Sequence, residues 1–339
     1  FIGTIVGAGL ASGKEITEFF TSFGPISFLG IIFCGIFYTV MGTLIAKISI
    51  HYNLNSYSDV IKVISPNLLG KLTGVITTFY LISSASIILA GSGALLNQFF
   101  GIPKIIGSII MLVIACIFLL RDTDGLIEVN SFIVPALLGT LSLITILYFL
   151  FCKDSLSLEF ISQFTPPKKG IAISTILYCG YNILCCCGVL VPLSSEVKDS
   201  KIVGKGIALG ALGLTLLCCA INLLLLVNQP YIYDVEIPLL LVAQRFGNVL
   251  LALLIMVILM EMFSTEVSDV YSISKTLEQA FHIEFKKGIF LVIGIALPIS
   301  QIGFSNLITT LYPLFGLLSL IFITQCVCFY FKHKKELNN

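Results

Sequence analysis

Hydroxyl side chains gather in the middle of one long hydrophobic segment, residues 247–282. Ser264 and Thr265 lie near its centre, on a polar stripe whose members step by three or four positions and so share one face of a helix. Hydroxyl and main-chain carbonyl oxygens are hard ligands of the kind that hard cations prefer. The pattern therefore favours a sodium site on this face. The alternative is a face that lines a water-filled path to the cytoplasm.

Three acidic residues belong to the same segment, namely Glu261, Glu266 and Asp269. An ionisable group inside a membrane span must face the protein interior or a water-filled cavity, and such groups mark ion and proton pathways. Asp269 lies nearer the end of the span and suits a wet exit path, whereas Glu261 and Glu266 are more central. All three are candidates to relay a proton or another charge.

The first residues of the chain carry four glycines between positions 3 and 13. Glycine lowers helix propensity by about 1 kcal/mol per residue, so a helix here is predicted to unwind near Gly7 to Ser12. The N–H groups of Gly7, Ala8 and Gly9, with Ser12 beside them, could then hold the carboxylate of a substrate. Close helix packing through small residues at four-residue spacing is the alternative.

Polar or charged groups lie on both sides of the predicted break. The carbonyls of Gly3 and Val6, before the predicted break, could coordinate a cation. After the break, Lys14 and Glu18 are four positions apart and could pair with each other on a helix. Glu15 has no opposite charge at that spacing. It could bind the amine of a cationic substrate, or carry a proton if burial raises its pKa.

A second interruption is predicted within residues 170–198, at the sequence from Gly180 to Gly188. Asn182 is a polar side chain deep in this span and needs a partner there. Tyr178 and Tyr181 could close over a ligand or pack in the core. The run of cysteines at 185–187 lacks the spacing of a metal site, so packing is the expected role.

The composition explains what these segments must be. The chain has 339 residues, of which 57% are hydrophobic and only 11% charged, with a net charge of +1. A soluble domain carries roughly 25% charged residues, so an all-helical integral membrane protein in a lipid bilayer is predicted, with no nucleic-acid partner. Ten spans are expected, at residues 1–23, 25–50, 69–99, 103–120, 125–152, 170–198, 201–228, 247–282, 287–303 and 305–332.

The charged residues between the spans predict the orientation. With the N-terminus and the C-terminus both in the cytoplasm, most of the 19 Lys and Arg residues lie on the cytoplasmic side. No basic segment with a cleavage site precedes the first span, so a signal peptide is not predicted. The chain opens at Phe1 rather than at Met, and a few residues are expected before it. We predict a multi-pass protein of the bacterial cytoplasmic membrane, and the sequence indicates no oligomeric state.

The two halves of the chain share a plan. Each begins with a glycine-interrupted span, and each has a short amphipathic piece after its second span, at 54–65 and at 236–246. Five spans per half would place the halves upside-down relative to each other, and paired broken spans indicate a transporter binding site. The predicted division is a first repeat at 1–152, an extracellular connection at 153–169 and a second repeat at 170–339.

Two motifs resemble those of a known family. The stretch Thr4-Ile5-Val6-Gly7-Ala8-Gly9-Leu10-Ala11-Ser12-Gly13-Lys14-Glu15 resembles the opening signature of the YkvI-type bacterial membrane proteins, which are relatives within the amino acid–polyamine–organocation superfamily. Gly7-Ala8-Gly9 resembles the Gly-x-Gly of that superfamily's amino-acid permeases, and Tyr178-Cys179-Gly180-Tyr181-Asn182 is similar to its sixth-helix motif. The resemblance covers the ten-span layout, while the specific motif lies mainly in the first span.

The resemblance implies a LeuT-type fold, a 5+5 inverted repeat whose first and sixth helices are discontinuous and which works by alternating access. It implies that Gly7, Ala8 and Gly9 receive a substrate carboxylate. It also implies that Gly3 and Val6, with Ser264 and Thr265, match the second sodium site of sodium-coupled relatives. Asn182 departs from the pattern, because many permeases carry an acid there. No Lys lies within 125–152, the span where a Lys replaces sodium in some proton-coupled relatives, and this favours sodium.

The predicted function is cation-coupled symport of a small amino acid or related amine, a zwitterionic or cationic molecule. Sodium is the expected coupling ion, with a proton as the alternative, and no other cofactor is expected. The alternative is a membrane receptor that binds such a ligand without moving it, as in germinant sensing. An enzyme is not predicted, because the chain has neither an H-E-x-x-H nor a G-x-S-x-G motif.

Overall fold

The hydrophobic segments are helices in the computed structural model, which describes residues 2–54, 56–65, 68–121, 126–152 and 165–337. Lipid offers no hydrogen-bond partner to a peptide group, so each segment satisfies its own backbone as a helix. Over the described ranges the regular structure is helical, without a strand. The long helices are α4 (Ser27–Tyr52), α6 (Leu68–Phe100), α7 (Lys104–Arg121), α8 (Leu126–Phe151), α10 (Ile171–Val197), α11 (Ser200–Leu226), α13 (Asn248–Phe281), α14 (Phe285–Ser300) and α15 (Phe304–Lys332).

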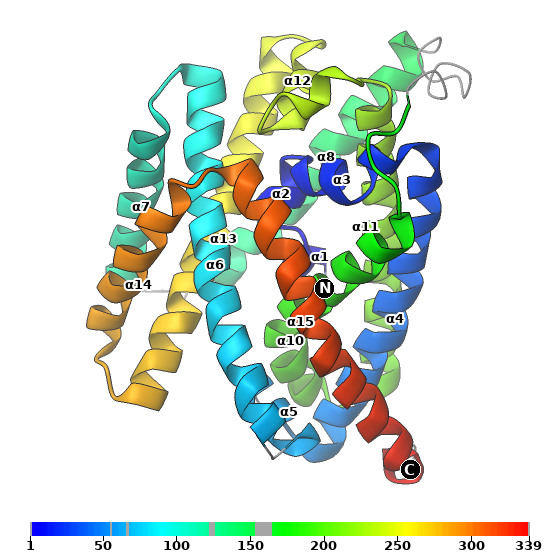
Figure 1. The fold of residues 1–339 in the computed structure, drawn as a ribbon, viewed down its shortest axis with the longest axis vertical. Coiled ribbons are helices and arrows are strands. Elements are labelled where there is room, and N and C mark those ends of the chain that lie inside the picture. The colour runs from blue at the N-terminus through cyan, green and yellow to red at the C-terminus, as the bar shows by residue number, and fades with distance from the viewer. Residues whose placement is uncertain (1, 55, 66–67, 122–125, 153–164, 338–339) are drawn as a thin grey trace.

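The first hydrophobic segment is broken, as its glycines predicted. It consists of α1 (Ile2–Ile5), α2 (Ala8–Ala11), α3 (Lys14–Phe19) and the 3-10 helix η1 (Thr21–Ile26). Figure 1 shows these short pieces within the bundle, with longer helices on both sides of them. Together with the nine long helices, this broken segment confirms the ten predicted spans along the described part of the chain.

The second predicted break is not found, because α10 runs from Ile171 to Val197 as one helix. Gly180 serves close packing instead. A Cβ added at Gly180 would lie 2.7 Å from the carbonyl oxygen of Gly316 in α15 and would also collide with the Ser319 hydroxyl. Small residues let the backbones of membrane helices approach each other in this way. The glycine that suggested a break therefore marks a helix contact.

Short helices lie where amphipathic pieces were predicted. They are α5 (Tyr57–Ile64), after α4, and α12 (Pro238–Gln244), which follows the 3-10 helix η3 (Tyr231–Tyr233) after α11. A four-residue helix, α16 (Lys334–Leu337), ends the described chain. Asp199 caps the N-terminus of α11 by accepting bonds from the N–H groups of Lys201 and Ile202. These two N–H groups hold the pKa of the Asp199 carboxyl below its usual value.

The helices pack in two groups around the broken segment. On one side α4 packs against α10 and α11, and α10 packs against α15. On the other side α6 contacts α7, α13 and α14. The broken segment lies between these groups, since α1 contacts α10 and α2 contacts both α6 and α13. The interior of the protein is thus built around the segment with the weakest helix propensity.

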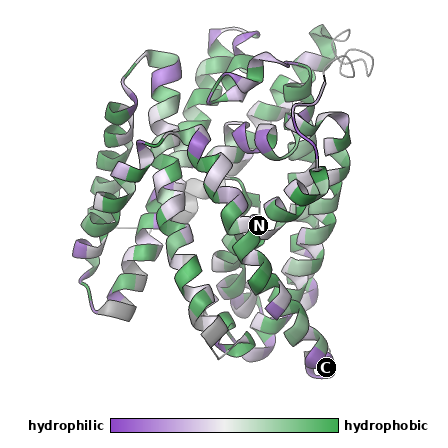
Figure 2. Cartoon of the chain, viewed as in Figure 1, coloured by the Kyte–Doolittle hydropathy of each residue, from purple (hydrophilic) through white to green (hydrophobic). Residues whose placement is uncertain are grey.

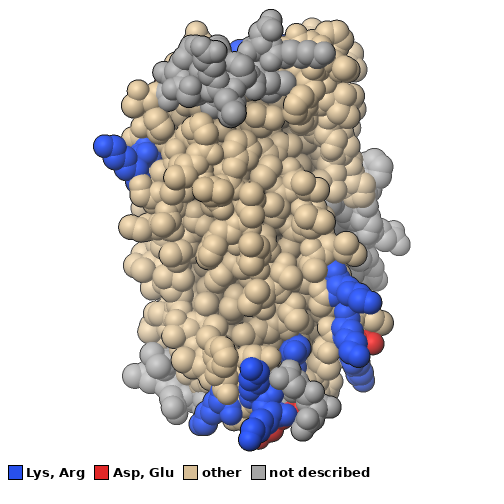
Figure 3. All heavy atoms as spheres, turned by 90° about the vertical axis from the view of Figure 1, so that its right-hand side faces the viewer, with Lys and Arg blue, Asp and Glu red and all other residues tan. Residues whose placement is uncertain are grey.

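The outer surface of the bundle suits lipid. Six helices among the described residues are long and apolar enough to cross a membrane, and large hydrophobic side chains such as Leu29, Phe79 and Leu209 are exposed on their outer faces. Figure 2 shows hydrophobic residues over most of the helix lengths. Figure 3 shows one face with a broad belt free of charge and with Lys and Arg gathered mainly at one end. The chain is a multi-pass membrane protein.

The predicted division into two repeats joined at 153–169 stays a prediction. Residues 153–164 of that connection lie outside the described residues. The described remainder runs over the broken segment, where the N–H of Lys168 donates to the Ser22 carbonyl at 3.0 Å.

Candidate functional site

The first segment breaks twice, and each break has its own geometry. Gly7 separates α1 from α2 with an extended backbone, φ −130° and ψ −173°. Gly13 separates α2 from α3 in the left-handed region, at φ +81°, which favours glycine. The Ser12 hydroxyl bridges the second break, because it donates to the Gly9 carbonyl at 2.9 Å and accepts from the Lys14 N–H at 3.2 Å. Ser12 therefore stabilises the turn.

Two glycines of the break have opposite surroundings. A Cβ added at Gly7 would meet no other atom within 4 Å, so open space borders this residue. A Cβ added at Gly9 would collide with the side chain of Glu15. Ala8 and Gly9 are both buried. The carboxylate of Glu15 thus covers Gly9, and the free space lies at Gly7.

Glu15 is the buried carboxyl group of the site. Only 1% of this residue is exposed. Its Oε2 accepts a hydrogen bond from the Tyr178 hydroxyl of α10 at 3.1 Å, and its carboxyl also interacts with the hydroxyl of Tyr312 in α15. The rings of Phe19 and Phe20 pack on Tyr178, with centroids at 5.2 Å and 5.0 Å. The site therefore joins residues of three separate segments around one carboxylate.

Further tyrosines extend this group toward the bundle centre. Tyr181 stacks on Tyr312, with ring centroids 4.1 Å apart and planes at 22°. Tyr80 of α6 meets Tyr181 edge-on at 5.7 Å. Tyr178 and Tyr181 were predicted as candidates, whereas Tyr312 was missed because nothing in its spacing sets it apart from other aromatic residues of its span. The five side chains of Glu15, Tyr80, Tyr178, Tyr181 and Tyr312 are called the Glu15 cluster below.

Asn182 lies one turn along α10 from Tyr178 and is fully buried. Its Nδ2 donates to the Tyr178 carbonyl at 3.0 Å. Its Oδ1 is buried without a hydrogen-bond partner in the described structure. A buried acceptor without a partner costs about 1–3 kcal/mol, which makes Asn182 a candidate ligand group.

The first part of the polar face of α13 is largely buried, and α13 packs against α2 beside the break. Ser264 is 2% exposed, and the Thr265 hydroxyl donates to the Glu261 carbonyl at 2.9 Å. Glu261 and Glu266 are also buried. One carboxyl oxygen of each, and one of Asp269, has no hydrogen-bond partner in the described structure.

The pairing of Lys14 with Glu18, predicted from their spacing, does not form. Glu18 forms an ion pair with Lys168. The Lys14 amine donates to the Val235 carbonyl at 3.0 Å. A hollow of about 240 Å³ lies outside this layer and is lined in part by Glu18, Phe19 and Lys168. Phe19 thus touches both this hollow and, through its ring contact with Tyr178, the Glu15 cluster.

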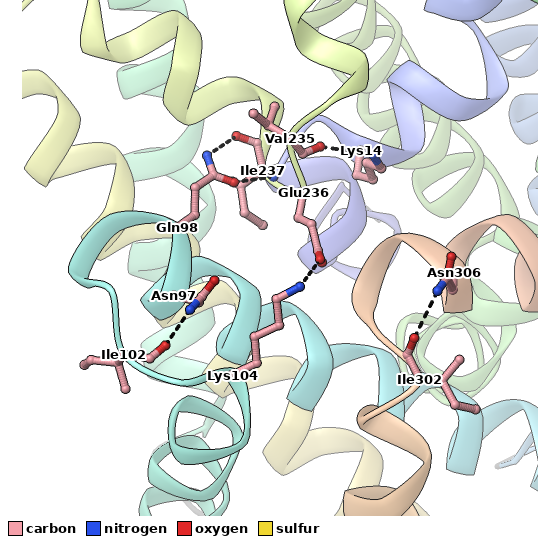
Figure 4. Close-up of polar contacts among 10 residues, drawn as sticks. All are labelled: Lys14, Asn97, Gln98, Ile102, Lys104, Val235, Glu236, Ile237, Ile302 and Asn306. Atoms are coloured by element: carbon pink, nitrogen blue, oxygen red, sulfur yellow. Dashed lines mark hydrogen bonds and ion pairs between the residues drawn. The ribbon is translucent and has the colours of Figure 1, made fainter.

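Residues 235–239, called the outer strap below, connect the broken segment to α6 and α7. Figure 4 shows Lys14, Gln98 and Lys104 reaching this strap from different helices. Gln98 donates to the Ile237 carbonyl at 3.2 Å and accepts from the Ile237 N–H at 3.0 Å. Lys104 forms an ion pair with Glu236. The N–H of Leu239 donates to the Ser12 carbonyl at 3.0 Å, so the strap is fixed to the break itself.

Replacing Gln98 with Ala is expected to loosen the outer strap. The substitution leaves both polar groups of the Ile237 backbone without their partner, at a cost of about 1–3 kcal/mol. Hydrogen–deuterium exchange at residues 235–239 should therefore become faster. Asn97→Ala is the control, because Asn97 donates within its own turn to the Ile102 carbonyl at 2.9 Å. Unchanged exchange at the strap in Gln98→Ala would contradict this account.

Two proteins of Bacillus subtilis (strain 168) are similar to the chain over nearly its whole length. The membrane protein YkvI is 31% identical over 329 residues, which cover 97% of this chain and 93% of YkvI. YyaD is 27% identical over 335 residues, covering 97% of this chain and 94% of YyaD. No family model matches the chain.

Solved structures of transporters are similar in fold. A manganese transporter of Eremococcus coleocola has a TM-score of 0.64 at 14% identity, covering 94% of this chain and 74% of that one. Mhp1 in an inward-facing conformation has a TM-score of 0.63 at 13% identity, covering 98% and 73%. MhsT in complex with L-phenylalanine has a TM-score of 0.64 at 13% identity, covering 91% and 78%. At these identities the likeness shows the fold alone, and it is the LeuT-type fold.

Proposed function

The chain belongs to the YkvI family of membrane proteins, and we propose that it is a secondary transporter of the amino acid–polyamine–organocation superfamily. It moves a small amino acid or a related amine by alternating access. The observation that carries this proposal is the twice-broken first segment, whose breaks lie beside a buried carboxylate and open space at Gly7. Non-helical backbone at membrane depth is tolerated where it lines a cavity or a binding site.

The proposed coupling ion is sodium. Its ligands are the carbonyls of Gly3 and Val6 before the break and the hydroxyls of Ser264 and Thr265 on α13. Contact between α13 and α2, which begins two residues after Val6, supports the Val6 end of this assignment. Buried carboxyl oxygens on α13 add negative charge near the same face and would assist a cation.

A proton is the competing coupling ion. Glu261, Glu266 and Asp269 would carry it, and their unpartnered oxygens are the observation in its favour. An isolated buried carboxylate is costly unless it is protonated or bound to a cation. The two hypotheses therefore differ in which gradient drives transport, that of sodium or that of protons.

The proposed orientation places both termini in the cytoplasm of the bacterial cell. α5 and the C-terminus lie at the same end of the bundle, and basic residues such as Lys62, Lys332 and Lys335 belong to these elements. The outer strap and α12 lie toward the opposite end, above α3. Under the positive-inside rule, the strap is then extracellular.

Uptake into proteoliposomes tests the proposal. Purified protein is reconstituted, and labelled amino acids and amines are offered under an inward sodium gradient, an inward proton gradient or neither. Accumulation that requires the sodium gradient would support the sodium symporter. Accumulation that requires only the proton gradient would move the coupling to the carboxyls of α13. A ligand that binds but is neither taken up nor exchanged would replace the transporter with the receptor.

A further inference from the structure

The Glu15 carboxylate lacks a basic partner among the described residues. The groups that act on it are the hydroxyls of Tyr178 and Tyr312. Its neighbour in sequence, Lys14, points elsewhere, because its amine donates to Val235 and the charges that act on it are those of Glu18, Glu236, Lys168 and Asp234. A carboxylate that is 1% exposed and without a cation is expensive to keep charged. A cationic ligand would compensate it.

The groups around Glu15 also suit a cation. Four tyrosine rings belong to the Glu15 cluster, and Phe315 meets Tyr80 edge-on at 5.5 Å. The face of an aromatic ring attracts an ammonium group by about 0.5–2 kcal/mol, depending on how far water is excluded. Asn182 supplies a further acceptor, since its Oδ1 is buried one turn along α10 without a partner. An acceptor and aromatic rings thus lie near the Glu15 carboxyl, and no described Lys or Arg side chain reaches it.

The position of Glu15 works against a substrate carboxylate. The glycine segment was predicted to receive such a carboxylate at Gly7, Ala8 and Gly9. In the structure, the side chain of Glu15 already covers Gly9 so closely that a Cβ there would collide with it. A second carboxylate beside it would be repelled, and in a buried site this repulsion is screened only weakly.

We infer that the substrate is an organic cation without a carboxylate, a primary amine or an alkylated ammonium, with Glu15 as its counter-ion. This inference rests on the proposed function for the existence of a substrate site and narrows the class of that substrate. The ammonium group binds Glu15 and the Asn182 Oδ1, and the tyrosine rings enclose its carbon atoms. An amino acid would bring a carboxylate that the chain already supplies.

Matched ligand pairs test this inference on the wild-type protein. Phenethylamine is compared with phenylalanine, and cadaverine with lysine, so that the members of each pair differ in the carboxylate. Dissociation constants are measured by thermal shift and by calorimetry in detergent, near neutral pH and in sodium. We expect the amine of at least one pair to bind at least tenfold more tightly than its amino acid. Tighter binding of both amino acids, or no binding of either amine, would overturn the inference.

Substitution of Glu15 tests the role of its charge. Glu15→Gln keeps the shape and is expected to weaken amine binding by roughly 10- to 100-fold, the usual worth of a buried charged hydrogen bond. Glu18→Gln is the matched control, because Glu18 pairs with Lys168 in the outer layer, and amine binding should stay within twofold. If Glu15→Gln does not fold, Tyr312→Phe is used in its place. It keeps the aromatic ring, removes the hydroxyl and should weaken amine binding severalfold. Unchanged amine affinity in Glu15→Gln, or in Tyr312→Phe if that variant is needed, would overturn the assignment.

The test separates this inference from the proposed function, because binding and uptake are measured apart. An amine that binds through Glu15 but does not enter proteoliposomes would leave the inference standing and remove the transporter. Uptake of amino acids whose corresponding amines do not bind would support the transporter and remove the inference about the substrate.

Discussion

A Gly7→Val substitution is expected to abolish ligand binding while leaving the protein folded. Gly7 has an extended backbone at φ −130° and ψ −173°, a conformation that valine adopts readily. The new side chain would enter space in which no atom lies within 4 Å of its Cβ, so the Cβ itself meets no clash. That space borders the break, where the proposed substrate binds. Filling it should weaken binding by about 100-fold or more, which corresponds to roughly 3 kcal/mol.

The measurement compares ligand-induced thermal stabilisation in the two proteins, because a ligand that binds only the native state raises its apparent stability. Gly188→Val is the control, since Gly188 also has open space around it but lies exposed on the surface of α10. It should bind ligand like the wild type. Normal ligand affinity in Gly7→Val would mean that the open space at the break is not the substrate site.

Gly9 provides the contrast that makes the experiment specific. A methyl group there collides with Glu15, so Gly9→Ala must move the buried carboxylate and should lower the melting temperature. Two glycines separated by one residue thus predict different losses. Gly7→Val should lose ligand binding but keep its stability. Gly9→Ala should lose stability as well as binding.

The sequence allowed the ten spans and the break in the first segment to be predicted, because both depend on local properties. Hydrophobic length gives a span, and several glycines close together weaken a helix wherever it lies. The prediction of a second break was wrong because a tertiary contact, which the sequence does not show, explains the glycine. Gly180 lies against the backbone of Gly316, so its lack of a side chain serves contact between α10 and α15, and the helix stays continuous.

The candidate site could be predicted only in part. Glu15, Tyr178 and Asn182 stood out as polar groups within hydrophobic spans, and the structure places Tyr178 on Glu15. Tyr312 reaches the same carboxyl from almost 300 residues away in the sequence, and one sequence gives no signal for such a contact. The outer strap could not be predicted either. Gln98 binds the main chain of Ile237, and main-chain groups are the same whatever the residue type.

Charges at the outer end illustrate the same limit. The spacing of Lys14 and Glu18 suggested a local pair along one helix, and α3 is long enough to form it. Each residue has a more distant partner instead, Val235 for Lys14 and Lys168 for Glu18. Exposed helical pairs at this spacing contribute only ~0.5 kcal/mol, so tertiary contacts easily replace them. As a result, the local pattern identified the charged layer but not its connections.

Replacing Ser264 and Thr265 together with Ala is expected to abolish the stabilisation of the protein by sodium. The two hydroxyls lie on the face of α13 where sodium is proposed to bind, and removing both leaves that ion with main-chain oxygens only. A ligand present at about 100 times its dissociation constant stabilises the native state by ~2.7 kcal/mol. The double variant should lose this increment in sodium and should melt in sodium as it does in potassium.

The control is a second pair of hydroxyls on the same helix. Ser268 and Ser272 lie farther along α13, where Ser272 is exposed and donates to the Ser268 carbonyl. Ser268→Ala with Ser272→Ala removes the same number of hydroxyls and should leave the sodium response intact. Melting temperatures are measured in sodium and in potassium at two pH values. An undiminished sodium response in the Ser264 and Thr265 double variant would remove the proposed ion site. A response to pH alone would assign the coupling to Glu261, Glu266 and Asp269, whose buried oxygens would then bind protons rather than face a metal ion.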